Sequence, residues 1–164
     1  MMKNNEHNSS QNLSQNSAEN TLTDTSKEAY TYFFPITTRW MDNDIFGHVN
    51  NVNYYSYFDT VVNQFLIENA GFEPTKSEEI GFIVSSQCQY LHSIAYPDKL
   101  IGAFRVNKIG NSSVEYGVAI FKKNSDSAAA TGQLTHVFVN RQTEKPTPIN
   151  SSMRTAMQHA MLDA

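Results

Sequence analysis

The chain has 164 residues, which is enough for one domain with a sizeable hydrophobic core. Its net charge of −4 and its scattered basic residues argue against a general nucleic-acid-binding surface. A single cysteine, Cys88, excludes an intramolecular disulfide framework and a cysteine-rich zinc site. His92 and His136 show no metal-ligand spacing, so we expect the protein to need no metal and no other cofactor.

The first 28 residues differ in composition from the rest of the chain. Residues 1–28 are dominated by Asn, Ser, Gln and Thr and contain few large apolar side chains. Such a segment buries too little apolar surface to offset the entropy of ordering, which predicts a disordered tail followed by one domain over residues 29–164. The tail lacks the apolar region of a secretory signal, and no apolar run approaches the roughly 20 residues that cross a bilayer. We therefore expect a cytoplasmic protein without a membrane partner.

The folded part begins with a predicted strand and a predicted helix. Residues 30–40 are rich in aromatic and β-branched side chains, which predicts a strand, and Pro35 within it favours an edge or a bend. From residue 52 to residue 70, apolar side chains recur at helical intervals. This spacing predicts a helix of about five turns, capped at its start by Asn50 or Asn51 and stopped by the glycine that follows.

Four further strand-like segments follow, with turn-forming residues between them. They are residues 81–91, 99–109, 113–122 and 128–140. In the third segment, apolar residues alternate with polar or small ones, the period of a half-buried strand. Short turns favour antiparallel neighbours, and a final short helix is predicted to start near Asn150. The order of elements predicts an α+β fold in which an antiparallel sheet wraps around one helix.

Chemically reactive side chains are concentrated between the first strand and the long helix. Residues 39–51 read Arg-Trp-Met-Asp-Asn-Asp-Ile-Phe-Gly-His-Val-Asn-Asn. Free backbone N–H groups at a helix start can polarise a carbonyl group while a nearby carboxylate acts with the attacking nucleophile. This arrangement points to acyl transfer, and specifically to hydrolysis.

The same motif, followed by Tyr54 and an aromatic helix, resembles that of the hot-dog-fold acyl-CoA thioesterases related to 4-hydroxybenzoyl-CoA thioesterase. Three later segments fit this family in the same order, namely Tyr96-Pro97-Asp98, Lys108 to Ser113 and Phe138 to Arg141. The resemblance covers residues 30–161 and implies the hot-dog fold and hydrolysis of acyl-CoA to a free acid and coenzyme A. Because relatives pair their sheets and share active sites between chains, it also implies a homodimer or homotetramer.

Asp44 is the residue to which the resemblance gives the catalytic role, as general base or as nucleophile, and the sequence leaves both roles open. Without the motif, an aspartate here would be a turn or capping residue. Asp42 is expected to be structural, with its side chain hydrogen-bonded to hold the loop in place. Gly47 permits a turn with positive φ or a close approach of the substrate, and the resemblance implies that amides here and at the helix start polarise the thioester carbonyl.

Two further polar residues of the motif have a structural and a catalytic interpretation. His48 can donate to the carbonyl oxygen or orient a water, although a lone histidine is more often structural. Asn51 can cap the helix, and its amide can also hold the attacking water. Plant acyl-carrier-protein thioesterases have a similar element with an asparagine two residues before the histidine. This chain has Phe46 there, which favours the simpler mechanism centred on aspartate.

Substrate contacts are predicted for two groups of residues. Tyr54 and Phe58 are expected to line the acyl pocket or to belong to the core. The candidates for the phosphates or pantetheine arm of coenzyme A are Lys108, Ser112, Ser113 and Arg141, each of which is otherwise a solvated loop residue. Two alternatives to an acyl-CoA thioesterase stay open: a non-catalytic module that binds acyl thioesters, and a thioesterase acting on acyl-carrier protein.

Overall fold

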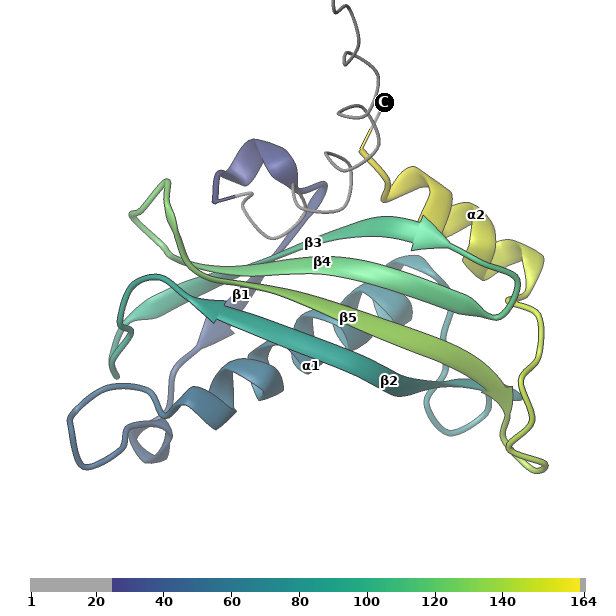
Figure 1. Ribbon diagram of the computed structural model, residues 1–164, viewed down its shortest axis with the longest axis horizontal. Coiled ribbons are helices and arrows are strands. Elements are labelled where there is room, and N and C mark those ends of the chain that lie inside the picture. The colour runs from purple at the N-terminus through teal and green to yellow at the C-terminus, as the bar shows by residue number, and fades with distance from the viewer. Residues whose placement is uncertain (1–24, 163–164) are drawn as a thin grey trace, which may run out of the picture.

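The structure of the protein is a computed structural model that describes residues 25–162. A five-stranded antiparallel sheet, in the order β1-β3-β4-β5-β2, curves around one long helix, α1 (Figure 1). The strands are β1 (Tyr32–Thr37), β2 (Glu79–Tyr90), β3 (Lys99–Ile109), β4 (Ser113–Lys122) and β5 (Ala128–Asn140). The helices are α1 (Asn51–Asn69) and α2 (Ser151–His159), with short 3₁₀ helices η1 (Lys27–Ala29) and η2 (Trp40–Asp42). The predicted α+β class is confirmed, whereas most of the predicted tail, residues 1–24, lies outside the described residues.

Helix α1 matches the predicted residues 52–70 to within one residue at each end. It begins where the side chain of Asn50 accepts a hydrogen bond from the Val52 amide (3.1 Å), so the first of the two predicted caps is the one used. Gly71 follows the helix with φ of +70°, a left-handed conformation that favours glycine. The apolar stripe of α1 is buried against the concave face of the sheet and forms the main core.

The predicted strands agree with the sheet because turn residues mark their ends. β3, β4 and β5 coincide with their predicted ranges, and β2 begins two residues before the predicted one. β1 is shorter than predicted and lies at an edge, where Pro35 with its missing N–H is tolerated. β2 forms the opposite edge.

The predicted half-burial of residues 113–122 is wrong for the second half of β4. Ala119 and Phe121 are fully buried although they face away from α1. The chain before β1 covers this outer face, and the ring of Tyr30 packs edge-on against the ring of Phe121 (centroids 6.1 Å apart). A small second core therefore forms on the convex side of the sheet.

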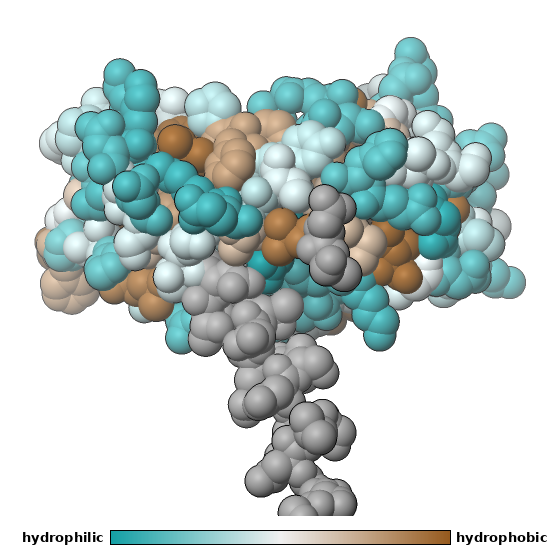
Figure 2. All heavy atoms as spheres, turned by 90° about the horizontal axis from the view of Figure 1, so that it is seen from above, coloured by the Kyte–Doolittle hydropathy of each residue, from teal (hydrophilic) through white to brown (hydrophobic). Residues whose placement is uncertain are grey.

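The two edges of the sheet differ in how well they are covered. The end of α2 lies against β3 beyond the short β1, and the Val106 amide donates to the Ala160 carbonyl (2.9 Å). Along β2, in contrast, Ile83 and Val84 are 46% and 60% exposed, and among the described strands β2 has only β5 as a neighbour. The face seen in Figure 2 is mostly hydrophilic, with apolar groups in separate patches. Because β2 is an edge strand with exposed apolar side chains, its outer edge is the long backbone edge that nothing in residues 25–162 covers.

Candidate active site

The motif predicted to carry the chemistry forms a small closed turn between η2 and α1. Asn43 and Val49 form an isolated antiparallel bridge at its base. Inside the turn, the Asp44 amide donates to the His48 carbonyl (2.8 Å) and the Gly47 amide donates to the Asp44 carbonyl (3.1 Å). Gly47 has φ of +82°, so it makes the turn with positive φ that was one of the two roles considered for this glycine.

Asp44 is half-buried and directly follows Asn43 at the base of this turn. Its Oδ1 atom accepts a hydrogen bond from the Phe46 amide (2.9 Å). Within residues 25–162, its Oδ2 atom has no hydrogen-bond partner. One oxygen is thus held in place by the turn, and the other is available to a water or a substrate.

Backbone amides near Asp44 fall into two groups, engaged and free. Asn50 binds two amides at the start of α1, those of Val52 (3.1 Å, by its side chain) and Asn53 (2.9 Å, by its carbonyl). Among the described residues, three amides between residues 44 and 53 make no hydrogen bond, those of Ile45, His48 and Asn51, and the last two are nearest in the chain to the start of α1. These two N–H groups flank the start of α1, where the helix dipole favours negative charge. Because the Gly47 amide is already donated, that glycine contributes its conformation rather than a free donor.

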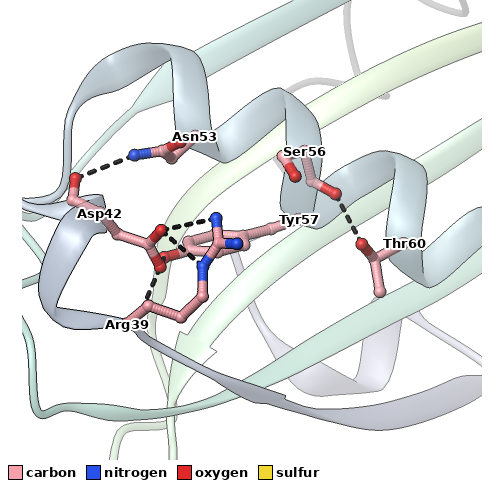
Figure 3. A network of polar contacts seen from close by, with 6 residues as sticks. All are labelled: Arg39, Asp42, Asn53, Ser56, Tyr57 and Thr60. Carbon is pink, nitrogen blue, oxygen red and sulfur yellow. Dashed lines mark hydrogen bonds and ion pairs between the residues drawn. The ribbon is translucent and has the colours of Figure 1, made fainter.

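Asp42 holds the most densely bonded carboxylate at this end of the molecule and is fully buried, with 0% exposure. Figure 3 shows the side chains of Arg39 and Tyr57 converging on it. The Arg39 amide (2.8 Å) and the Tyr57 hydroxyl (2.7 Å) donate to Oδ2, while Nε (2.9 Å) and Nη2 (2.8 Å) of Arg39 lie against Oδ1. Burial alone would raise the pKa of Asp42, but the hydrogen bonds from Tyr57 and Arg39 outweigh it and lower that pKa. The predicted structural role of Asp42 fits these contacts.

Sequence reasoning missed the partners of Asp42. No hydrogen-bonding role was predicted for Arg39, Asn53 or Tyr57. A usable signal existed, because Asn50, Asn53 and Tyr57 follow one another at helical spacing on one face of α1. Polar groups repeating on that face indicate a hydrogen-bonding partner facing the helix.

The two predicted acyl-pocket residues are both buried in this chain. Phe58 is fully buried, and a Cβ atom added at Gly132 would come within 2.5 Å of its ring. Tyr54 packs edge-on against the ring of Tyr90 at the end of β2 (centroids 5.1 Å apart). Tyr54 therefore lies between the core and the end of the sheet where α1 begins, whereas Phe58 is a core residue of the protomer.

The predicted coenzyme A contacts lie at the other end of the sheet from Asp44 (Figure 1). The residues concerned are Lys108, Ser112 and Ser113 around the β3–β4 hairpin and Arg141 just after β5. Arg141 donates to the carbonyls of Pro74 (2.6 Å) and Ser77 (2.9 Å) and borders a polar hollow of about 410 Å³ that also contains Lys76. A single chain does not bring this cationic end together with Asp44.

Other kinds of site are not evident in the described part of the chain. Between residues 25 and 162, no three His, Cys, Asp or Glu side chains are grouped so as to hold a metal ion. None of the described helices is long and apolar enough to cross a membrane. Cys88 is half-buried, and burial raises the pKa of its thiol to about 11, which leaves little thiolate at neutral pH. The turn at Asp44 therefore holds the strongest candidate for chemistry.

Comparison with known proteins places the chain in a family. The sequence pattern of the thioesterase-like superfamily matches residues 38–157, from the end of β1 to α2. The chain belongs to the thioesterase-like superfamily. The crystal structure of the PA5185 protein from Pseudomonas aeruginosa strain PAO1 is 44% identical, and the match covers 85% of this chain and 98% of that one with a TM-score of 0.83.

A solved structure of lower sequence identity shares the fold, and one curated protein matches part of the sequence. Slr0204, a 1,4-dihydroxy-2-naphthoyl-CoA thioesterase from Synechocystis, is 14% identical over 77% of this chain and 95% of its own, with a TM-score of 0.69. The protein YsmA of Bacillus subtilis (strain 168) is 28% identical over 89 residues, which are 54% of this chain. That match spans only 59% of YsmA. The two solved structures, PA5185 and Slr0204, confirm the predicted hot-dog fold.

Proposed function

We propose that this protein hydrolyses acyl-CoA thioesters, with Asp44 as the catalytic carboxylate. The observation that carries the proposal is one turn that holds a half-buried carboxylate with a free oxygen beside two free amides, those of His48 and Asn51. As a general base, Asp44 takes a proton from water while the water oxygen attacks the carbonyl carbon. The C–S bond then breaks, and the coenzyme A thiolate leaves and takes up a proton. As a nucleophile, the Asp44 carboxylate would instead attack the carbonyl carbon and displace the coenzyme A thiolate, which takes up a proton. The mixed anhydride formed is then hydrolysed by water to the free acid and the Asp44 carboxylate.

The free amides supply hydrogen-bond donors, which the carboxylate does not have. The carbonyl oxygen gains negative charge as the nucleophile adds, and N–H groups at a helix start stabilise such a charge without rearrangement. The amide of Asn51 belongs to the first residue of α1, and that of His48 lies in the preceding turn. The exposed side chains of both residues remain candidates for orienting the thioester or the water.

The proposed partner of the chain is a second copy of itself. Edge strand β2 presents unpaired backbone groups together with the exposed side chains of Ile83 and Val84. Val52 and Tyr55 on α1 are also exposed. A long apolar edge of this kind favours pairing with another strand, which supports a homodimer or a tetramer of such dimers.

Pairing of the two β2 strands would also complete the site. The start of β2 lies beside Arg141, whose amide donates to Glu78 (2.7 Å), and the end of β2 lies at α1, where Tyr90 donates to the Asn51 carbonyl (3.2 Å). An antiparallel pair places the start of one strand beside the end of the other. The cationic end of one copy then lies next to Asp44 of the other, within reach of a bound coenzyme A.

The acyl group and the carrier stay open. Slr0204 acts on an aromatic acyl-CoA, and residues of this chain at the mouth of the turn, such as Ile45 and Phe46, are exposed and apolar. Acyl-carrier protein as substrate and binding without turnover are the competing functions. Location in the cytoplasm is likewise a proposal that rests on the sequence alone.

The proposal is tested by thiol release from short, medium, long and aromatic acyl-CoAs with the wild type and Asp44→Ala. We expect turnover on part of the panel and a loss of about 10²–10⁴ in kcat in the variant, the range for general acid–base catalysis. The control is Asp126→Asn, which removes a fully exposed carboxylate paired with Lys27 and should change kcat less than twofold. Binding without turnover by the wild type would favour the binding module.

The two roles of Asp44 are separable by mass spectrometry. Rapid quenching during turnover, followed by analysis of the peptide that contains Asp44, detects an acyl adduct if the carboxylate is the nucleophile. A general base is expected to leave the peptide unmodified at every time point while product forms.

A further inference from the structure

The backbone carbonyl of Asp42 is bonded to α1 as firmly as its side chain is. It accepts the amide of Asn50, the cap residue of α1 (2.8 Å). It also accepts the side-chain amide of Asn53 in the first turn of the helix (2.9 Å; Figure 3). The side chain of the next residue, Asn43, accepts the Tyr96 amide (3.0 Å). The segment immediately before Asp44 is thus fixed on one side by the helix and on the other by the loop that precedes β3.

The bonds to Asp42 come from both sides of the catalytic turn. Arg39 lies before the turn, whereas Asn50, Asn53 and Tyr57 lie after it in the chain. Closing the turn in this way sets the distance between Asp44 and the start of α1. The cap of the 3₁₀ helix η2 needs only the hydrogen bond from the Arg39 amide to the Asp42 side chain. The contacts from Asn53 and Tyr57 to Asp42 are therefore not explained by capping of η2.

We infer that Asp42 is a positioning residue, a buried carboxylate that holds Asp44 in register with the free amides at the start of α1. The inference rests on the proposed function and deepens it. The carboxylate and the amides act on the same thioester group, so their separation decides whether both reach it at once. A displacement of about 1 Å in such a pair costs on the order of 10² in rate.

The charge on Asp42 suits this role. A carboxylate accepts through both oxygens at once, and both are used here by the charged Arg39 side chain, the Arg39 amide and the Tyr57 hydroxyl. An asparagine keeps the shape but presents an NH₂ group to one of these donor sets. In this anchor, the set of hydrogen bonds to the Asp42 side chain, one donor set would then face an NH₂ group instead of an acceptor, at a residue with 0% exposure.

The test measures kcat and KM for Asp42→Asn, Tyr57→Phe and Asn53→Ala on the best acyl-CoA. We expect kcat to fall about 10²-fold in Asp42→Asn and about tenfold in each of the other two, with KM within about twofold of the wild type. Tyr116→Phe is the matched control, because its hydroxyl is fully buried and has no hydrogen-bond partner among the described residues. That control should leave kcat unchanged.

The fluorescence of Trp40 gives a second measurement, which reports on the local mobility of η2 and not on the global stability of the protein. Trp40 is the only tryptophan of the chain, it opens η2 two residues before Asp42, and its ring packs edge-on against Tyr96 (centroids 5.9 Å apart). Loosening the anchor should lower the fluorescence anisotropy of Trp40 in Tyr57→Phe, with the far-UV circular dichroism unchanged. Tyr116→Phe should keep the wild-type anisotropy.

The outcomes separate the inference from the proposed function. Folded Tyr57→Phe and Asn53→Ala variants with wild-type kcat and wild-type anisotropy overturn the inference, even if Asp42→Asn fails to fold. A rise in KM with kcat intact also overturns it, because binding rather than alignment is then affected. Absence of turnover by the wild type overturns the proposed function, and the Trp40 anisotropy then decides the anchoring alone.

Discussion

The two ends of the sheet differ in the chemistry that they present. Where α1 begins, the chain places the carboxylates of Asp42 and Asp44 together with free backbone amides. At the opposite end lie Lys76, Lys108 and Arg141, together with the serines of the β3–β4 hairpin. β2 joins the two ends, and its 12 residues keep them roughly 36 Å apart. One chain therefore separates the groups suited to hydrolysis from those suited to bind phosphates, and two antiparallel copies would bring them together.

Among changes that act on the relation between the two ends, the largest effect is expected from breaking the β2 edge. Val84→Asp places a charge at the middle of the exposed strand, and in a paired sheet the two new carboxylates would lie close together and repel. We expect monomers by light scattering and a loss of about 10²-fold in kcat/KM, because Asp44 loses the cationic end of the other copy. Asp126→Asn again serves as control, since it removes an exposed carboxylate of the β4–β5 turn, outside β2. A fully active monomer would show that one chain suffices.

Unfolding at acid pH should separate the contribution of His136 to stability from that of Asp42, because the two groups act in different pH ranges. His136 is buried in β5 opposite Ile83, and burial lowers its pKa from 6.5 to about 4. Between pH 6.5 and pH 4, His136 therefore binds a proton in the unfolded chain but not in the folded one. The free energy of unfolding is thus highest above pH 6.5 and decreases as the pH falls toward 4. We expect the free energy of unfolding to drop by about 3 kcal/mol from pH 8 to pH 4, and by much less in His136→Gln.

Asp42 has the same sign of pH dependence in a lower window. Its lowered pKa stabilises the fold above the ordinary aspartate pKa, and that contribution is lost as the pH falls through the folded-state value. Asp42→Asn should thus keep the slope between pH 6.5 and 4 that His136→Gln removes. Urea unfolding at a series of pH values measures both, and a slope between pH 6.5 and 4 that persists in His136→Gln would contradict the assignment to the histidine.

A smaller effect is expected at the cationic end. Arg141→Ala should raise KM for acyl-CoA about tenfold, the size of a lost charge-assisted hydrogen bond, with little change in kcat. The same variant should be normal on an acyl-N-acetylcysteamine thioester, which has no phosphates. An equal rise in KM on both substrates would instead indicate that Arg141 acts only by holding Pro74 and Ser77.

The sequence predicted the elements better than it predicted their contacts. Strand limits were predictable at β3, β4 and β5 because Gly, Asn, Ser and Asp residues mark the turns, and the helix followed from its apolar spacing. The outer core was missed, because nothing local shows that Tyr30 folds back over Phe121. Tertiary contacts of this kind override the period of a single strand.

The candidate site was likewise predictable only in those features that depend on local sequence. The motif gave the turn, the positive φ of Gly47 and the position of Asp44 before the helix. The bond between Tyr57 and Asp42 joins residues 15 apart and depends on how the loop meets the helix. The distance of Arg141 from Asp44 depends on strand order, which short motifs do not encode.

The most direct test mixes two defective chains. Asp44→Asn and Arg141→Ala are co-expressed with different tags, and the heterodimer is purified and assayed at acyl-CoA concentrations below KM. If Asp44 of one copy works with Arg141 of the other, each heterodimer has one intact site, and about half of the wild-type kcat/KM should return. Activity no higher than the mean of the two homodimers would contradict the account.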